Sequence, residues 1–101
     1  MDEKKIARVM KALSHPNRLK LYLEIAKKHE ATYATGEREC YISNIVSKFK
    51  IGAPTVSHHL KELANAELIV TERKGKLLVA KINEKTVNMV NDVLALKQGR
   101  Q

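Results

Sequence analysis

The chain has 101 residues, of which 44% are hydrophobic and 30% charged, and it carries a formal net charge of +8 at pH 7. This length suits one small folded domain, and the composition excludes collagen-like and low-complexity proteins. The excess of Lys and Arg favours a polyanionic partner, either nucleic acid or an anionic membrane surface.

The lack of a recognisable targeting signal and the low cysteine content both favour the cytoplasm. No apolar stretch of the signal-peptide type follows the N-terminus, and no run approaches the roughly 20 residues of a membrane-spanning helix. Cys40 is the only cysteine, which excludes an internal disulfide and a multi-thiolate metal site within one chain. One Phe, three Tyr and no Trp supply few stacking platforms for single-stranded nucleic acid. We therefore predict a cytoplasmic protein whose partner is double-stranded DNA, with no membrane partner.

Apolar periodicity predicts two helices in the N-terminal third of the chain. The first covers about residues 3–13 and the second about residues 16–28, with Ser14 placed to cap the second. The main apolar stripe of the second helix is expected to be Leu19, Tyr22, Leu23 and Ala26, widened by Leu21 and Ile25. Residues 30–39 lack an apolar period and are expected to form a surface loop.

The next segment has the pattern of two short helices joined by a tight turn. Apolar residues at helical spacing begin at Ile42, with Tyr41 or Ser43 marking the helix entry, and Pro54 opens a second helix. Residues 42–66 are therefore predicted to form a helix-turn-helix. One side of its second helix carries small polar or cationic groups that can reach base edges and phosphates, namely Thr55, Ser57, His58 and Lys61.

Two adjacent histidines lie in this second helix. The side chains of His58 and His59 point about 100° apart, so they cannot both face DNA. We assign His58 to the DNA groove and His59 to the edge of the core. Adjacent positions also fail the i, i+3 or i, i+4 spacing that two metal ligands on one helix need, so this pair is not expected to bind a metal.

An extended pattern replaces the helical one after Ala66. Residues 68–82 are predicted to form a β-hairpin with a two-residue turn at Lys74-Gly75, because glycine adopts a positive φ cheaply. Contact with the DNA backbone or the minor groove is expected from the cations at its tip, which are Arg73, Lys74 and Lys76. A last helix over about residues 84–97 is apolar on two sides, so it needs its own core and, most simply, a second chain as partners.

The order of these elements is that of a winged helix-turn-helix, and two segments resemble a known family. The sequences ALSHPNRL at residues 12–19 and APTVSHHLKEL at residues 53–63 resemble the ArsR/SmtB family of bacterial and archaeal transcriptional regulators. The resemblance implies a mainly α fold with a β-hairpin wing over residues 1–101, dimeric through its first and last helices, residues 3–13 and 84–97.

The resemblance also implies a homodimeric repressor that binds an imperfect palindrome at a promoter and leaves it when a small effector binds. The positions that contact DNA in the family carry over to Thr55, Ser57, His58 and Lys61 on the recognition helix and to Arg73, Lys74 and Lys76 on the wing.

The metal sites best known in this family are not matched. One family site has a Cys-x-Cys pair at the start of the first short helix, and in this chain those positions are Tyr41 and Ser43. A second family site uses Asp and His ligands along the last helix, and the last predicted helix contains no His. Candidate ligands that a folded-back loop could gather are His29, Glu30, Glu37, Glu39 and Cys40. Acids beside an exposed loop usually face water, and a lone cysteine is more often an inert buried group. We therefore predict no metal and no cofactor, and the effector stays unidentified.

Two positions depart from the family pattern. Gly52 stands where a capping Ser is common, and Glu67 stands where a turn Gly is usual. A positive φ at Glu67 would cost stability, although neither departure abolishes the fold.

Two other function classes compete with DNA binding. An enzyme is not expected, because Ser57 and His58 are adjacent rather than converging across a pocket, and no third residue is evident to orient an imidazole. The alternative is a winged-helix module that binds a protein or an RNA through the same face.

Overall fold

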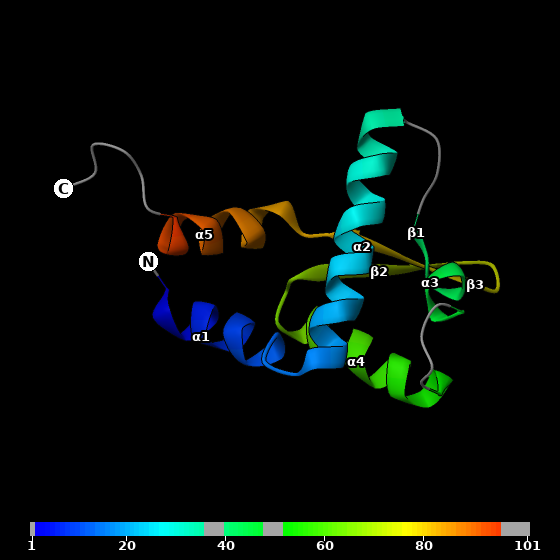
Figure 1. The fold of residues 1–101 in the computed structure, drawn as a ribbon, viewed down its shortest axis with the longest axis horizontal. Helices are drawn as coiled ribbons and strands as arrows, with labels where there is room; N and C mark the ends of the chain where they lie inside the picture. Colours follow the sequence, from blue (N-terminus) through cyan, green and yellow to red (C-terminus); the bar gives the residue numbers. More distant parts are fainter. Residues whose placement is uncertain (1, 36–39, 48–51, 96–101) are drawn as a thin grey trace.

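The structure, a computed structural model, describes residues 2–35, 40–47 and 52–95 (Figure 1). Its elements are α1 (Glu3–Ala12), α2 (Pro16–Thr35), β1 (Cys40–Tyr41), α3 (Ile42–Val46), α4 (Ala53–Asn65), β2 (Ile69–Lys74), β3 (Leu77–Ile82) and α5 (Glu84–Leu94). In Figure 1, α2 crosses the middle of the molecule, α1 and α5 extend to one side, and the β2–β3 hairpin reaches the other. None of the described helices combines the length and the hydropathy needed to cross a membrane.

One hydrophobic core joins the first four helices to the hairpin. Its most deeply buried large side chains are Val9, Leu21, Ile25, Val56, Leu63 and Leu68. The last helix contributes to this core only at its edge, because Val87 and Val90 pack against it while staying partly exposed. The core is therefore centred on α2 and α4, and α5 lies outside it.

The sheet has the strand order β1-β3-β2, with all pairs antiparallel. β1 consists of Cys40 and Tyr41, which pair with Ala80 and Val79. The sequence analysis did not predict this strand, because two residues are too few to show alternation. It ties the chain directly before α3 to the hairpin, so the helix-turn-helix and the hairpin are held together by main-chain hydrogen bonds.

The hairpin turn lies one residue later than predicted. Lys74 pairs with Leu77, so the two turn residues are Gly75 and Lys76 rather than Lys74 and Gly75. Gly75 has a φ of +63° at the first turn position, which is where type II′ hairpin turns favour glycine. A Cβ at this position would meet nothing within 4 Å, so the need for glycine is conformational rather than steric.

α2 is longer than predicted, and the expected loop over residues 30–39 is wrong for its first half. The helix runs from Pro16 to Thr35 and is 20 residues long. No Gly or Pro interrupts the sequence between Pro16 and Gly36, and two alanines lie in the added turns. Loss of the apolar period therefore did not end the helix, because no helix-breaking Gly or Pro stands before Gly36.

The apolar stripe of α2 is also different from the prediction. Leu21 and Ile25, expected only to widen the stripe, are the fully buried pair, with 1% and 0% of their surface exposed. Leu19 and Leu23, expected at its centre, are 38% and 54% exposed. α2 carries apolar residues on two sides, and which side faces the core was decided by the packing of α4 and β3 against it.

His15 caps the start of α2, a role predicted for Ser14. The backbone N–H of Asn17 donates to Nδ1 of His15 over 3.2 Å. Ser14 instead donates its hydroxyl to the carbonyl of Lys11 over 2.7 Å, which satisfies an acceptor at the end of α1. The two helices are therefore joined by a tight connection in which each polar side chain serves a different helix end.

α4 ends in a Schellman motif whose left-handed residue is Glu67. The N–H of Leu68 donates to the carbonyl of Leu63 over 3.1 Å, and the N–H of Glu67 donates to that of Ala64 over 2.9 Å. Glu67 has a φ of 62°, so it adopts the positive φ that is usual for the turn glycine at this position in the family. Its carboxylate forms an ion pair with Lys5 at 3.1 Å, which links α1 to the end of α4.

Candidate nucleic-acid interface

α4 has one side in the core and one side in solvent. Val56, Leu60 and Leu63 are at most 4% exposed, at the i, i+4, i+7 spacing of one helix side. The side chains that the sequence analysis placed on the opposite side are all exposed, and these are Thr55, Ser57, His58 and Lys61. The predicted orientation of this helix is confirmed, while the DNA contacts of its residues stay a prediction.

A groove of about 310 Å³ lies between α4 and the hairpin. Its polar lining comes from both elements and consists of Ser57, Lys61 and Asn65 from α4 and Thr71 and Arg73 from β2. All five are exposed, so the groove opens to solvent. Thr71 and Arg73 are two positions apart on one strand, which places both side chains on the same side of the sheet.

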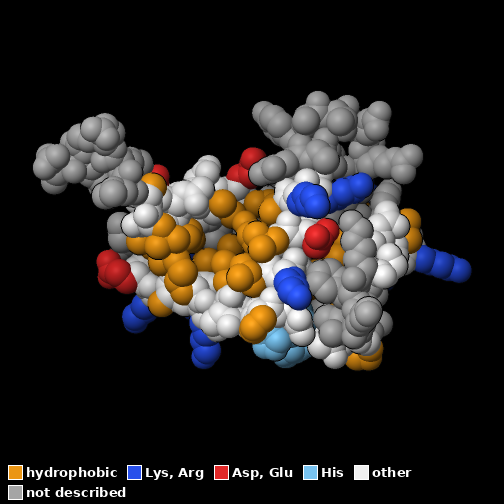
Figure 2. Space-filling view, in the orientation of Figure 1, with side chains coloured by type: hydrophobic (Ala, Val, Ile, Leu, Met, Phe, Trp, Pro, Cys, Tyr) orange, Lys and Arg blue, Asp and Glu red, His pale blue; other side chains and the backbone are white. Residues whose placement is uncertain are grey.

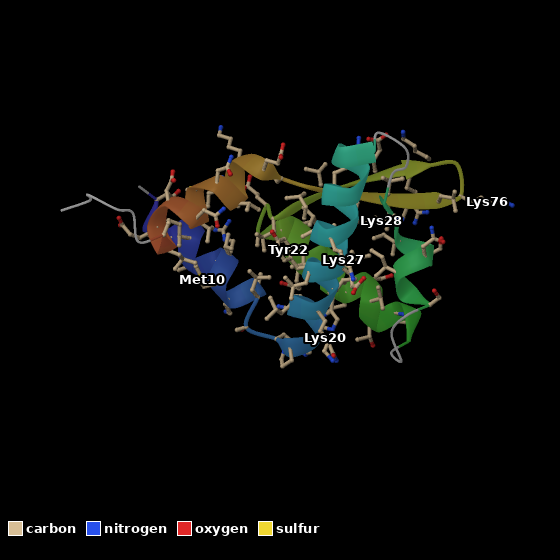
Figure 3. The ribbon with its side chains drawn as sticks, turned by 45° about the horizontal axis from the view of Figure 1, so that its top comes forward. Met10, Lys20, Tyr22, Lys27, Lys28 and Lys76 are labelled. Atoms are coloured by element: carbon tan, nitrogen blue, oxygen red, sulfur yellow. The ribbon has the colours of Figure 1, made fainter. Side chains whose placement is uncertain are left out.

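The three predicted wing cations occupy different positions. Arg73 lines the groove and faces α4. Lys74 follows it on the strand, so its side chain leaves the opposite side of the sheet. Lys76 lies in the turn, and Figure 3 shows it at the tip of the hairpin, pointing away from the rest of the molecule. The hairpin therefore presents positive charge beside α4 and also beyond it.

His58 and His59 diverge as predicted. His58 is exposed, whereas His59 is 3% exposed, with its ring centroid 4.7 Å from that of His15. Nε of Arg18 donates to Nδ1 of His59 over 3.4 Å, and Nη1 of Arg18 donates to the carbonyl of Ala12 over 3.2 Å. Arg18 thus connects the end of α1 and the start of α2 to the middle of α4.

The protonation state of His59 follows from these contacts. Nδ1 accepts a hydrogen bond, so the neutral ring carries its proton on Nε2, which has no hydrogen-bond partner in the described part of the chain. Burial lowers the pKa of His59 below its ordinary value of 6.5, and positive charge at His15, Arg18 and His58 lowers it further. His59 is therefore neutral at pH 7 and supports α4 from beneath.

The candidate metal ligands cannot be placed. Glu37 and Glu39, together with the side chains of His29, Glu30 and Cys40, lie outside the described residues. Among the residues that the structure does describe, no three His, Cys, Asp or Glu side chains are arranged to hold a metal ion.

The sequence analysis missed three residues that the structure brings to this region. Asn65 lies four residues after Lys61, and Thr71 two residues before Arg73, so helix and strand periodicity could have found both. Arg18 lies far from α4 in the sequence, and no local pattern indicates its contact with His59.

Comparison with known proteins identifies the family. A sequence model described as bacterial regulatory protein, arsR family, matches residues 30–71. The transcriptional repressor SdpR of Bacillus subtilis is 35% identical over 75 residues, which cover 74% of this chain and 72% of that protein. The chain belongs to the ArsR family. The arsenical resistance operon repressor of Staphylococcus xylosus is also similar, with 27% identity over 94 residues that cover 93% of this chain and 81% of the relative.

Solved structures of ArsR-type proteins share the fold. The crystal structure of an ArsR family transcriptional regulator superimposes with a TM-score of 0.73 and 16% identity, covering 93% of this chain and 87% of the other. The homodimeric winged helix-turn-helix DNA-binding domain of a possible ArsR-family regulator from Mycobacterium bovis superimposes with a TM-score of 0.67 and 23% identity. The match covers 89% of this chain and 75% of the other. The chain therefore has the winged helix-turn-helix fold of these structures, and its family is one of bacterial regulatory proteins.

Proposed function

We propose that two copies of this chain bind an imperfect palindromic operator, repress the adjoining promoter and leave the DNA when an effector binds. In each copy, α4 enters the major groove and the hairpin meets the backbone or the minor groove. The proposed DNA contacts are Thr55, Ser57, His58 and Lys61 from α4 and Arg73, Lys74 and Lys76 from the hairpin. The carrying observation is that the exposed side of α4 and the cationic hairpin border one open groove, so a single duplex can engage both.

The exposed surface of α5 supports the homodimer. Thr86 is the buried residue of this helix, while Val87 and Val90 are partly exposed and Leu94 is 65% exposed. Figure 2 shows hydrophobic side chains gathered over α1 and α5. Such a surface is typical of a subunit interface, and a second copy would cover it with the same residues.

A two-fold dimer sets the geometry of the operator. Two recognition helices related by such an axis bind half-sites about 34 Å apart, one turn of the double helix. The net charge of +8 on each chain suits this partner, because DNA presents phosphates along its whole length. We also propose that the chain forms one domain over residues 1–101 and acts in the cytoplasm.

A titration with duplex DNA tests the proposed function. Fluorescence polarisation should show binding to the protein's own promoter duplex about a thousandfold tighter than to a random duplex at physiological salt. Equal affinity for both would contradict sequence-specific operator binding. A copurifying protein or RNA together with no duplex preference would favour the alternative partner instead.

Two substitutions separate the proposed roles of the helix and the wing tip. Lys76→Gln should weaken binding to all duplexes alike and lower the slope of log affinity against log salt by about one, because one phosphate contact is lost. His58→Ala should change which sequence is preferred while leaving that slope unchanged. The same result from both substitutions would contradict this division.

A further inference from the structure

We propose that the groove between α4 and β2 holds one phosphodiester of the bound DNA strand and contacts it from two sides. Ser57 and Lys61 reach this phosphate from α4, and Thr71 and Arg73 reach it from the hairpin. The inference rests on the proposed function and deepens it. Of the base edges and phosphates that Ser57 and Lys61 could reach, it assigns both residues to a phosphate.

The charges around the groove favour an anion. Lys61 and Arg73 line it from different elements, and no acidic side chain among the described residues forms an ion pair with either of them. The neighbouring acids Glu62 and Glu72 do not line the groove. Two cations that share a small groove repel one another until an anion lies between them. A phosphate supplies that charge where a DNA strand passes from the major-groove helix to the wing.

The neutral lining also suits a nucleotide backbone. The hydroxyls of Ser57 and Thr71 and the amide of Asn65 can donate hydrogen bonds to phosphate oxygens. The rest of the lining includes Leu78, which is partly exposed and can present apolar surface to the adjoining deoxyribose.

Helix geometry divides the exposed side of α4 into two flanks. Ser57 and Lys61 are one turn apart and both border the hairpin. Thr55 and His58 are exposed but do not line the groove, and His58 lies about 100° around the helix from Ser57. Base reading therefore falls to Thr55 and His58, and phosphate positioning falls to the flank that faces the wing.

The test uses the full chain and a duplex recovered from a random library by selection with this protein. A methylphosphonate is introduced at one backbone position at a time, which removes one negative charge and keeps the sugar and base. We expect one position in each half-site at which the wild type loses about tenfold or more in affinity, the effect of one charge-assisted contact. In Lys61→Gln and in Arg73→Gln, that same position should lose most of its effect, because its charged partner is gone.

Matched variants make the outcome decisive. Lys28→Gln removes an exposed cation of α2 that does not line the groove, and it should keep the wild-type methylphosphonate profile (Figure 3). Ser57→Ala should weaken all sequences equally, whereas Thr55→Ala should change the preferred sequence. The inference is overturned if Lys61→Gln and Arg73→Gln silence different positions or none, or if Ser57→Ala shifts base preference. Failure to select any duplex would overturn the proposed function as well.

Discussion

The helices α4 and α5 have similar lengths, 13 and 11 residues, but the core covers them very differently. α4 buries Val56, Leu60 and Leu63 and presents polar or cationic groups to solvent. α5 buries Thr86 and leaves Leu94 largely exposed. The chain therefore completes the packing of α4 by itself and leaves α5 with uncovered apolar surface. The polar and cationic surface of α4 therefore suits a polyanion, whereas the apolar surface of α5 suits a second copy of the chain.

The largest effect is expected on dimerisation, when a charge is introduced on the exposed apolar surface of α5. Leu94→Lys should raise the dimer dissociation constant by about 100-fold or more, because losing a buried leucine costs roughly 2 kcal/mol and two-fold symmetry counts it twice. Sedimentation equilibrium measures the shift, and operator affinity should fall with it. The folded monomer should be spared, since Leu94 is already 65% exposed.

Asn88→Lys provides the control for that variant, because Asn88 is an exposed polar residue of the same helix and lies about 120° around it from Leu94. It adds the same charge and should leave the dimer intact. If Leu94→Lys stayed as dimeric as Asn88→Lys, the assignment of α5 to a subunit interface would be wrong.

The next substitution acts on the packing beneath α4. Arg18→Lys removes the Nε donor to His59 and the guanidinium contact with Ala12, so it should lower the free energy of unfolding by about 1–2 kcal/mol. Urea denaturation measures this change. Arg8→Lys, at an exposed position of α1, makes the same chemical change and should stay within about 0.5 kcal/mol of the wild type. Equal effects of the two would show that Arg18 does not hold α4 in place.

Acid should destabilise the α4 side through His59. Its folded-state pKa lies below the ordinary 6.5, so the unfolded chain takes up the proton first as the pH falls. The free energy of unfolding should therefore decrease from about pH 6.5 downward until the folded-state pKa is passed, and be insensitive to this group above that window. Urea denaturation across a pH series should show the decrease.

Two leucine substitutions attribute that acid sensitivity to one histidine. His59→Leu removes the buried titrating group and should flatten the decrease, whereas His58→Leu alters an exposed neighbour and should keep it. An unchanged pH profile in His59→Leu would rule out His59 as its source.

The smallest effect is expected at the end of α4. Glu67→Gly should be more stable than Glu67→Ala by roughly 1 kcal/mol, because a residue with a Cβ is strained at the φ of 62° found there. Both variants lose the ion pair with Lys5, so thermal or urea denaturation of the two isolates the backbone effect. Equal stability would mean that Glu67 occupies this conformation without strain.

Local patterns were enough to predict much of the candidate site. The apolar spacing of Val56, Leu60 and Leu63 determines which side of α4 is buried, and this places Thr55 and His58 in solvent. The opposite fates of His58 and His59 follow from the same 100° step. These features depend on neighbours a few residues apart, which is the range over which a sequence pattern carries information.

Other features depend on segments that are distant in the sequence, and only the tertiary structure decided them. The amphipathic α2 has apolar residues on two sides, and packing buried Leu21 and Ile25 rather than Leu19 and Leu23. The pairing of β1 with β3 and the contact of Arg18 with His59 join elements that no local period connects. The sequence by itself determined the order of the helices and the hairpin and the polar side of α4. The groove between α4 and the hairpin could not be predicted from the sequence, because a groove depends on the distance between two elements as well as on the residues of each. That distance is set by the tertiary structure.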